Sequence, residues 1–430
     1  MQHDLKTFKK GVHPPDRKEL ARDKAIESLP LFSDYYISTS AHIGAPAKVI
    51  VSAGEEVAQG QLIARNEARL GANVYSSVSG VVVGVERRKT AQGGRCEVIH
   101  IKQEGDRKVL LPDMPDKSKE SILARIDEAG IVGLGGAGFP AAFKDKPNKP
   151  CDLLVINGAE CEPYLNCDFR LMVERAEDVA KGIKLLQTAI GVEKAIVGIE
   201  ENKPEAIEAM KNTGLEVMVL KKRYPQGAEK MLIYAMTGRK VPANGGLPSD
   251  VGCVVHNIAT AYAVYDAVEN NEPLYKRVLT VSGKGVERPS NLLTLNGTQH
   301  ADIFNYCGIK EEVAELISGG PMMGHDLEDL TCSTTKAESG LLALMAEEAP
   351  RFMPTPCISC GSCARACPMN LMPMYIDFYT LAKKTEEAVK YGAMNCMECG
   401  CCAYVCPAKR PLVQSIRLTK QRVREEKQKK

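Results

Sequence analysis

Two short segments near the end of the chain hold nine of its sixteen cysteines. The first reads CISCGSCARACP from Cys357, and the second reads CMECGCCAYVCP from Cys396. Both contain the spacing C-x2-C-x2-C-x3-C-P. In this spacing three neighbouring thiolates ligate one [4Fe-4S] cluster, and the fourth ligates the other cluster. The sequence therefore predicts two [4Fe-4S] clusters.

The spacing assigns eight of these cysteines to clusters and leaves one spare. The ligands of one cluster are Cys357, Cys360, Cys363 and Cys406, and those of the second are Cys396, Cys399, Cys402 and Cys367. Cys401 is out of phase and is expected to ligate neither cluster. A zinc site would need two C-x2-C pairs rather than three cysteines in step, so zinc is disfavoured. Because iron-sulfur clusters transfer single electrons, another group must supply or accept them.

A second pair of cysteines, Cys161 and Cys167, lies in the segment CEPYLNC. The pair could suggest a metal site or a redox couple. We expect both to be inert buried thiols.

A glycine-rich segment, GLGGAGFPAAFK, contains Gly133, Gly135 and Gly138 in the pattern G-x-G-x-x-G. In a Rossmann unit this pattern follows a strand and begins a helix. Here the preceding residues, SILARIDEAGI, have helical spacing instead, which argues against an ordinary Rossmann site. Taken alone, the segment could equally be a glycine-rich turn without a ligand.

The whole chain has the composition of a soluble protein with several domains. It has 430 residues, of which 44% are hydrophobic and 26% are charged, and its net charge is +2. This charge argues against a nucleic-acid partner. No apolar run approaches the ~20 residues that span a bilayer, and the first residues lack the apolar core of a signal peptide. We therefore expect a cytosolic chain, in which clustered cysteines are metal ligands or redox groups rather than disulfides.

Changes of pattern along the chain divide it into six parts with different expected structures. We expect an extended N-terminal arm (1–40), a β-rich domain of two small sheets (41–112), an α/β domain (117–275), a small α+β module (276–335), the cysteine-rich domain (345–415) and a basic tail (416–430), which is a solvated or fraying helix.

The β-rich part resembles the barrel-sandwich hybrid fold of biotinyl and lipoyl domains. The resemblance rests on the turn AGEEVAQGQ and the return segment VSGVV. Those domains carry a modifiable lysine at a hairpin tip, whereas Arg69 falls near that place in this chain. A swinging-arm function is therefore not expected, and the domain is interpreted as structural.

The α/β part is similar to the NADH-oxidising flavoprotein subunit of respiratory complex I. Four segments match in the same order: GLGGAGFPAAFK, INGAECEP, YPQGAEK and VVHNIATAYAV. The resemblance implies a non-covalent FMN and NAD(H) as substrate. Glycine backbone can approach a flavin phosphate closely, Lys144 can balance its charge, and Phe139 can offer a flat face to a ring.

The same resemblance implies the residues of the site. Those expected to contact FMN are Gly133, Gly135, Gly136, Lys144, Asn157, Glu160, Tyr224, Gly227, Glu229, Asn257 and Thr260. Glu162 and Phe139 are expected to contact the dinucleotide, and Glu162 is the candidate catalytic residue. Ala228 and His256 depart from the family pattern, which has Glu and Asn there. The module after Arg277 would match that subunit's soluble-ligand-binding β-grasp (SLBB) domain.

Nearly the whole chain resembles the C subunit of the Rnf complex, a membrane-bound ferredoxin:NAD+ oxidoreductase. The likeness adds GVHPPDRK and SGGPMMG to the segments above. It implies electron transfer between the two clusters, FMN and NAD(H), with Na+ or H+ moved by partner subunits. The implied partners are the integral membrane subunits, the iron-sulfur B subunit and, indirectly, ferredoxin. The implied location is peripheral, on the cytoplasmic face of the membrane.

Two other functions are compatible with the same motifs. The first is an NADH-dependent flavin and iron-sulfur cobalamin reductase of a microcompartment, a related group that lacks the GVHPP arm. The second is a ferredoxin-like scaffold without catalysis. Co-purification with membrane subunits separates the first from the Rnf function, and a yellow preparation that NADH bleaches excludes the second.

Overall fold

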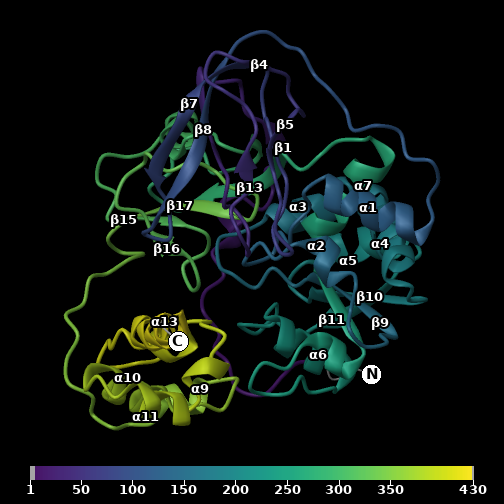
Figure 1. The fold of residues 1–430 in the computed structure, drawn as a ribbon. Helices are drawn as coiled ribbons and strands as arrows, with labels where there is room; N and C mark the ends of the chain where they lie inside the picture. The colour runs from purple at the N-terminus through teal and green to yellow at the C-terminus, as the bar shows by residue number, and fades with distance from the viewer. Residues whose placement is uncertain (1–4, 429–430) are drawn as a thin grey trace.

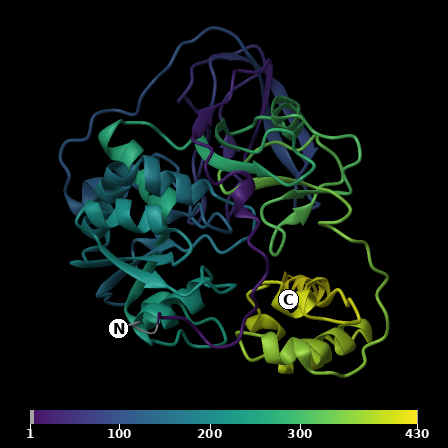
Figure 2. The same cartoon turned by 180° about the vertical axis from the view of Figure 1, so that it is seen from behind.

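The computed structural model describes residues 5–428, whose strands form four sheets and whose C-terminal part is helical (Figure 1). In Figure 1 the β-rich domain lies at the top, with the sheet that contains β13, β15 and β17 below it. The α/β domain extends down the right side, and the helical domain lies at the lower left. A view from behind shows the N-terminal segment passing between the α/β domain and the helical domain (Figure 2).

The β-rich domain consists of two small antiparallel sheets packed face to face. One has the order β2-β8-β7-β4 and the other β3-β5-β6. The bounds are β2 (Asp34–Ser38), β3 (Lys48–Val49), β4 (Glu56–Val57), β5 (Leu62–Arg65), β6 (Val74–Tyr75), β7 (Gly80–Lys89) and β8 (Arg95–Gln103). Ile63, Ile99 and Ile101 are fully buried between them. Arg69 is exposed, and its guanidinium lies 6.0 Å from the centre of the Phe143 ring.

The α/β domain is built on a parallel sheet of order β11-β10-β9-β12. Its strands are β9 (Leu153–Gly158), β10 (Lys194–Glu200), β11 (Glu216–Leu220) and β12 (Cys253–Asn257). Alternate residues of β9 point to opposite faces. Leu154 and Ile156 therefore pack under most of the helices, while Leu153 and Val155 pack under α6.

The helices of this domain cover both faces of the sheet. Their bounds are α1 (Lys119–Glu128), α2 (Ala141–Lys144), α3 (Cys167–Glu174), α4 (Ala176–Ile190), α5 (Pro204–Asn212), α6 (Glu229–Thr237) and α7 (Ile258–Glu269). The N-terminus of α1 is capped by the side chain of Ser118, which accepts a hydrogen bond from Ser121 N. Helix α1 precedes the glycine-rich segment, as the sequence pattern predicts.

The third sheet has the order β1-β14-β13-β17-β15-β16, with helix α8 (His300–Cys307) packed against it. Its strands are β1 (Ile26–Ser28), β13 (Lys276–Ser282), β14 (Ser290–Leu295), β15 (Glu315–Ser318), β16 (His325–Asp326) and β17 (Gly340–Leu344). Ile303 and Phe304 of α8 are fully buried on the sheet. The assignment of this module as a β-grasp domain stays a prediction.

The cysteine-rich domain is made of short helices around one long helix. The bounds are α9 (Ser362–Ala366), α10 (Pro373–Leu381), α11 (Thr385–Lys390), α12 (Cys401–Tyr404) and α13 (Leu412–Gln428), with the 3₁₀ turn η3 (Ala393–Asn395) between α11 and α12. Among residues 5–428, two other 3₁₀ turns lie outside this domain, η1 (Lys18–Leu20) and η2 (Pro248–Val251). Buried Asp377 of α10 accepts hydrogen bonds from Arg410 and Ser415, which fixes α10 against α13.

Three of the boundaries expected from the sequence lie elsewhere in the structure. Residues 26–28 and 34–38, expected in the arm, are β1 and β2, which pair with β14 and β8. Strand β17 extends the third sheet beyond residue 335. The expected tail at 416 begins inside α13, where Ile416 and Thr419 are fully buried. The tail assignment is therefore corrected, because helix packing continues through the basic segment.

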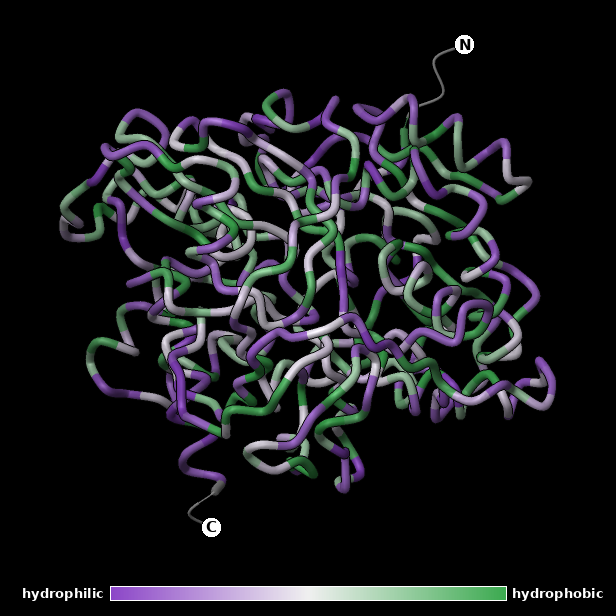
Figure 3. Tube along the Cα trace, turned by 90° about the horizontal axis from the view of Figure 1, so that it is seen from above, coloured by the Kyte–Doolittle hydropathy of each residue, from purple (hydrophilic) through white to green (hydrophobic). Residues whose placement is uncertain are grey.

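Among residues 5–428, none of the helices has the length and hydropathy that crossing a bilayer requires. Hydrophilic and hydrophobic residues alternate in short stretches along the chain (Figure 3).

Candidate flavin and iron-sulfur sites

The candidate flavin site lies at the carboxyl ends of the parallel strands. After β9 the chain continues to β10 on one side, while β12 pairs with β9 on the other side. This divergence is a topological switch point, the place where open parallel sheets bind ligands. Asn157 and Asn257 are paired across β9 and β12 there.

The glycine-rich segment is held against the end of β12. The hydroxyl of Thr260, which is fully buried, accepts a hydrogen bond from Leu134 N at 3.0 Å. A Cβ on Gly135 would lie 2.8 Å from Cβ of Asn257, so only glycine fits this close approach. At Gly136 nothing lies within 4 Å of the place of a Cβ. Asn257 and Thr260 thus support the glycine-rich segment on the side that faces β12, and the side at Gly136 stays open.

Two further pairs of expected site residues contact one another, and Gly227 also contacts Cys161. Asn157 Nδ2 donates to Gly227 O at 2.8 Å, and Lys144 Nζ lies 2.8 Å from Glu229 Oε1. Gly227 N donates to the thiol sulfur of Cys161 at 3.3 Å. These contacts join the loops after β9 and β11. Phe139 lies apart from them, and its ring packs edge-on against Phe143.

The two glutamates of INGAECEP have different surroundings. Glu160 accepts hydrogen bonds from Asp168 N and Phe169 N, the first backbone donors of α3. This carboxylate therefore fixes the start of α3. Glu162 accepts hydrogen bonds from the Tyr224 hydroxyl at 3.0 Å and from Met322 N at 3.1 Å. Glu162 also lines the open cavity described below, whereas Glu160 does not.

Burial changes the acidity of the carboxyls and thiols around this site. Burial raises the pKa of Glu162 to about 7. Burial and then the charge of Glu160 raise the pKa of Asp168 to about 7. Burial likewise raises the pKa of the Cys161 and Cys167 thiols, which fits inert thiols better than reactive ones. Glu160, Cys167 and Asp168 lie close enough to hold a metal ion, but both carboxylates already accept hydrogen bonds from the protein.

The departure at His256 has a local structural explanation. Its Nε2 lies 2.5 Å from Asp145 Oδ1, and both side chains are buried. The pair joins β12 to the residue after α2 and does not line the cavity. Ala228 is the residue before the first turn of α6, where its backbone carbonyl accepts from Met231 N and Leu232 N.

The structure adds two groups that the sequence did not single out. Lys18 Nζ is buried, donates to the carbonyls of Glu162 and Leu165, and lies 3.8 Å from a carboxylate oxygen of Glu160. Gly320 is the second group, because a Cβ there would lie 2.2 Å from a carboxylate oxygen of Glu162. Lys18 belongs to GVHPPDRK and Gly320 to SGGPMMG, so both motifs marked the site without showing their place in it.

A cavity of about 760 Å³ opens beside the glycine-rich segment. Its lining includes Gly135, Gly136 and Glu162, the loop 318–324 and, on the far side, residues 396–398. This volume lies within the ~300–1,000 Å³ typical of ligand pockets. The open backbone of the loop and the room at Gly136 fit a flavin or dinucleotide.

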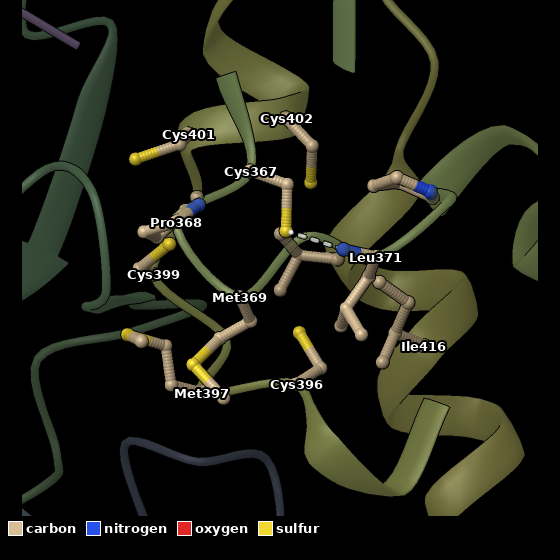
Figure 4. A pocket seen from close by; sticks show the side chains of 13 residues that line it. Cys367, Pro368, Met369, Leu371, Cys396, Met397, Cys399, Cys401, Cys402 and Ile416 are labelled. Atoms are coloured by element: carbon tan, nitrogen blue, oxygen red, sulfur yellow. Dashed lines mark hydrogen bonds between the residues drawn. The ribbon is translucent and has the colours of Figure 1, made fainter. Parts of the chain in front are cut away.

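The second cysteine set is gathered around one buried space. Cys367, Cys396, Cys399, Cys401 and Cys402 line it (Figure 4). The side chains of Cys367, Cys396 and Cys402 point into this space, whereas the sulfur of Cys401 points away from it (Figure 4). Four thiols in one enclosure form the donor set of a [4Fe-4S] cluster. The orientation supports, for this set, the predicted exchange of the fourth cysteine and the spare role of Cys401.

The first cysteine set is partly on the surface. Cys363 packs with Cys406 in a small cluster that includes Leu412, and its thiol lies 3.7 Å from the sulfur of Met374. Cys357 and Cys360 are exposed, in the irregular segment 351–361. The structure thus places Cys406 beside Cys363, as the exchange of the fourth cysteine requires.

Comparison with protein families gives three matches along the chain. Residues 6–106 match the RnfC barrel sandwich hybrid domain, and residues 126–266 match the Nuo51 FMN-binding domain. Residues 356–409 match a 4Fe-4S dicluster domain. These matches confirm the barrel-sandwich hybrid, the flavin domain and the iron-sulfur domain that the sequence predicts.

Two curated relatives are similar over most of their length. The C subunit of the proton-translocating ferredoxin:NAD(+) oxidoreductase complex of Clostridium ljungdahlii is 44% identical, over 88% of this chain and 87% of its own. The C subunit of the Na(+)-translocating ferredoxin:NAD(+) oxidoreductase complex of Acetobacterium woodii is 41% identical, over 97% of both chains.

A solved structure shares the fold. The NAD+-reducing [NiFe]-hydrogenase in its H2-reduced state matches with a TM-score of 0.54 at 20% identity, over 72% of this chain and 64% of that chain. Together, the fold and the two sites define a flavin and iron-sulfur electron-transfer protein. Within that class, the identities to the curated relatives are decisive. The chain belongs to the RnfC family, the C subunits of ion-translocating ferredoxin:NAD(+) oxidoreductase complexes.

Proposed function

We propose that this chain transfers electrons between NAD(H) and iron-sulfur partners as the C subunit of a ferredoxin:NAD+ oxidoreductase complex. The observation that carries the proposal is a buried contact between the two candidate sites. Cys399 and Cys401 pack with Tyr224, while Cys161 and Met322 pack against the same cluster of side chains. The cysteines of the second set therefore adjoin the residues around Glu162 directly.

Three groups of residues would hold the cofactors. The backbone of 133–136, with Lys144 and Asn157, would hold FMN, and the two cysteine sets would hold two [4Fe-4S] clusters. When bound, FMN exchanges a hydride with NAD(H) and passes electrons singly, which matches the one-electron clusters. Asn257 and Thr260 lie beneath the loop and would act by supporting it.

Glu162 is proposed to contact the nicotinamide end of the dinucleotide. It lines the cavity, and its carboxyl is fixed by Tyr224 and Met322. Because its pKa is raised to about 7, its carboxyl exchanges a proton near neutral pH. Phe139 is proposed to offer an apolar face nearby. Glu160, bonded to the start of α3, would position this segment rather than meet the nucleotide.

Large apolar side chains are exposed on the cysteine-rich domain around α10. They are Met372, just before the helix, and Tyr375, Phe378 and Leu381 within it. Exposed apolar side chains gathered in one place often mark a surface that meets a partner. Helix α10 also contacts the first cysteine set through Met374. We propose that this face meets the other subunits, the integral membrane ones and the iron-sulfur B subunit, with ferredoxin reached through them.

Attachment at the cytoplasmic face of the membrane, through partners, follows from this proposal. We also propose that the module of β13, β14, β15, β17 and α8 is the β-grasp domain of the family, because α8 lies across the sheet. The cobalamin reductase alternative is not favoured by the relatives' names.

The test is to express a tagged chain with and without the membrane subunits of the proposed complex and to solubilise the membranes in mild detergent. The proposal predicts recovery of the chain with those subunits, and release from membranes when they are missing. A chain that stays on membranes lacking them, even in high salt, would contradict attachment through partners.

A further inference from the structure

The N-terminal arm lies between the flavin domain and the cysteine-rich domain, and it contacts both. On the flavin side, Val12 forms an antiparallel bridge with Tyr224, in which each backbone N–H donates to the other's carbonyl at 2.9 and 3.0 Å. Arg223 adds a hydrogen bond to Phe8 O at 2.9 Å. On the other side, Gly11 N donates to Ala366 O at 3.1 Å, and Lys10 Nζ donates to Ala364 O at 3.2 Å.

These contacts meet where the two candidate sites adjoin. Val12 is 5% exposed and packs in one cluster with Tyr224, Ala366, Cys399 and Cys401. Ala366 and Ala364 belong to α9, which also carries Cys363 of the first cysteine set. The arm therefore touches the elements of both cysteine sets and the loop whose Tyr224 hydroxyl holds Glu162.

The covalent connection does not fix the cysteine-rich domain in place. Residues 351–356, which lead into it, are all exposed and lack regular structure. Six extended residues can span up to about 21 Å. The position of the domain thus depends on its packed contacts, and the arm supplies several of them. The course of the arm between the two domains is visible in Figure 2.

We infer that Gly11 and Val12 are positioning residues that hold the second cysteine set beside the flavin loop at the distance electron transfer needs. The inference rests on the proposed function. Electron tunnelling falls off exponentially with distance, so release of the domain from the flavin loop slows transfer without changing either cofactor. Neither residue lines the cavity beside Glu162, and both meet Tyr224 through its backbone rather than through the hydroxyl that holds Glu162. We therefore expect the reaction of the flavin with NADH to change little.

Gly11 offers a sharp test with a matched control. Its φ is +80°, and a Cβ there would lie 2.4 Å from Tyr224 O. Gly54, in the β-rich domain, has φ +84° and nothing within 4 Å of the place of a Cβ. Gly11→Ala and Gly54→Ala therefore carry the same backbone strain, but only Gly11→Ala forces the arm away from Tyr224. Val12→Thr is the second variant, because it keeps the volume and places a hydroxyl among apolar side chains.

The experiment uses the full chain with its cofactors, mixed anaerobically with NADH. Flavin reduction is followed by absorbance and cluster reduction by freeze-quench paramagnetic resonance, while small-angle scattering measures the compactness of each variant. We expect Gly11→Ala and Val12→Thr to slow cluster reduction by about tenfold or more, with flavin reduction within about twofold of wild type. Their scattering should show an expanded molecule, and Gly54→Ala should match wild type in every readout.

Three results are decisive against the inference. Unchanged cluster reduction in both variants would overturn it, as would an equal loss of flavin and cluster reduction, which would place the effect in the flavin site. Compact scattering in both variants would overturn it too. If wild type reduced neither group with NADH, the proposed function would fail, and scattering would still decide the role of the arm.

Discussion

The two cysteine sets have the same spacing but different surroundings. The second set encloses a buried space, and its member Cys399, together with the spare Cys401, packs against Tyr224 of the flavin loop. The first set has Cys357 and Cys360 on the surface, and its Cys363 lies beside Met374 of α10. The difference indicates a direction: one set adjoins the flavin site, and the other is open to a partner.

The largest expected effect comes from exchanging ligands between the two sets. Cys367→Ala should remove the cluster of Cys396, Cys399 and Cys402, and Cys406→Ala that of Cys357, Cys360 and Cys363, because each fourth cysteine crosses over. Iron per chain should fall from about eight to about four in each variant. Paramagnetic resonance of the reduced variants distinguishes which signal remains.

Cys401→Ala is the control for these substitutions, because its sulfur points away from the shared space (Figure 4). It should keep both clusters. Loss of a cluster in Cys401→Ala, with both kept in Cys402→Ala, would show that the wrong member of this adjacent pair was chosen.

The flavin end of the path is tested by Glu162→Gln. We expect normal FMN content and kcat/KM for NADH at least about tenfold lower, because only the contact with the nucleotide is removed. Glu201→Gln, at an exposed position after β10, serves as the control. If the variant instead lost flavin while its remaining holoprotein oxidised NADH normally, Glu162 would belong to the flavin contacts.

The stability of the folded chain should depend on pH through Asp168, a buried carboxyl beside the flavin site. The pKa of Asp168 is raised from 3.8 to about 7, so the folded chain holds this proton more tightly than the unfolded chain. Its contribution to stability is therefore lost as pH rises from about 4 to about 7, by up to about 4 kcal/mol.

Asp168→Asn should remove the fall in stability between about pH 4 and pH 7, because an amide does not titrate. Melting temperatures of variant and wild type should differ most above pH 7, with the variant more stable, and converge in acid. Asp127→Asn, exposed on α1, is the control. A difference between variant and wild type that does not vary with pH would refute the assignment.

The smallest effect on the isolated chain is expected from a substitution on the exposed surface of α10. Phe378→Ser should leave NADH oxidation unchanged and weaken recovery with the membrane subunits, by about 1 kcal/mol or more if Phe378 is an interface anchor. Val83→Ser is the control, because Val83 is an apolar side chain on β7 that is 50% exposed, against 62% for Phe378. Equal recovery of both variants would exclude α10 from the interface.

The cysteine ligands could be predicted because their spacing is local. The short loops in each repeat bring three thiols together whatever the rest of the fold does. The flavin site was predictable only through resemblance, since Gly135, Asn157 and Asn257 meet through sheet topology. Lys18 was missed because it reaches Glu160 from an arm more than a hundred residues away.

Other differences reflect context that a short segment does not carry. Residues 34–38 gain their strand by pairing with β8, and nothing in DYYIS reveals that partner. In α13, buried Ile416 and Thr419 lie among many basic residues, which hide the apolar face of the helix.

The most direct test of the proposed electron path is an anaerobic NADH titration of the full chain reconstituted with FMN, iron and sulfide. Flavin absorbance, iron content and paramagnetic resonance are recorded on the same samples. We expect one FMN and about eight irons per chain, with cluster signals that appear once the flavin is reduced. The contradicting result is a flavin that NADH bleaches while the clusters stay oxidised. It counts only in protein with full iron content and a compact shape, and only if a chemical reductant of lower potential reduces the same clusters.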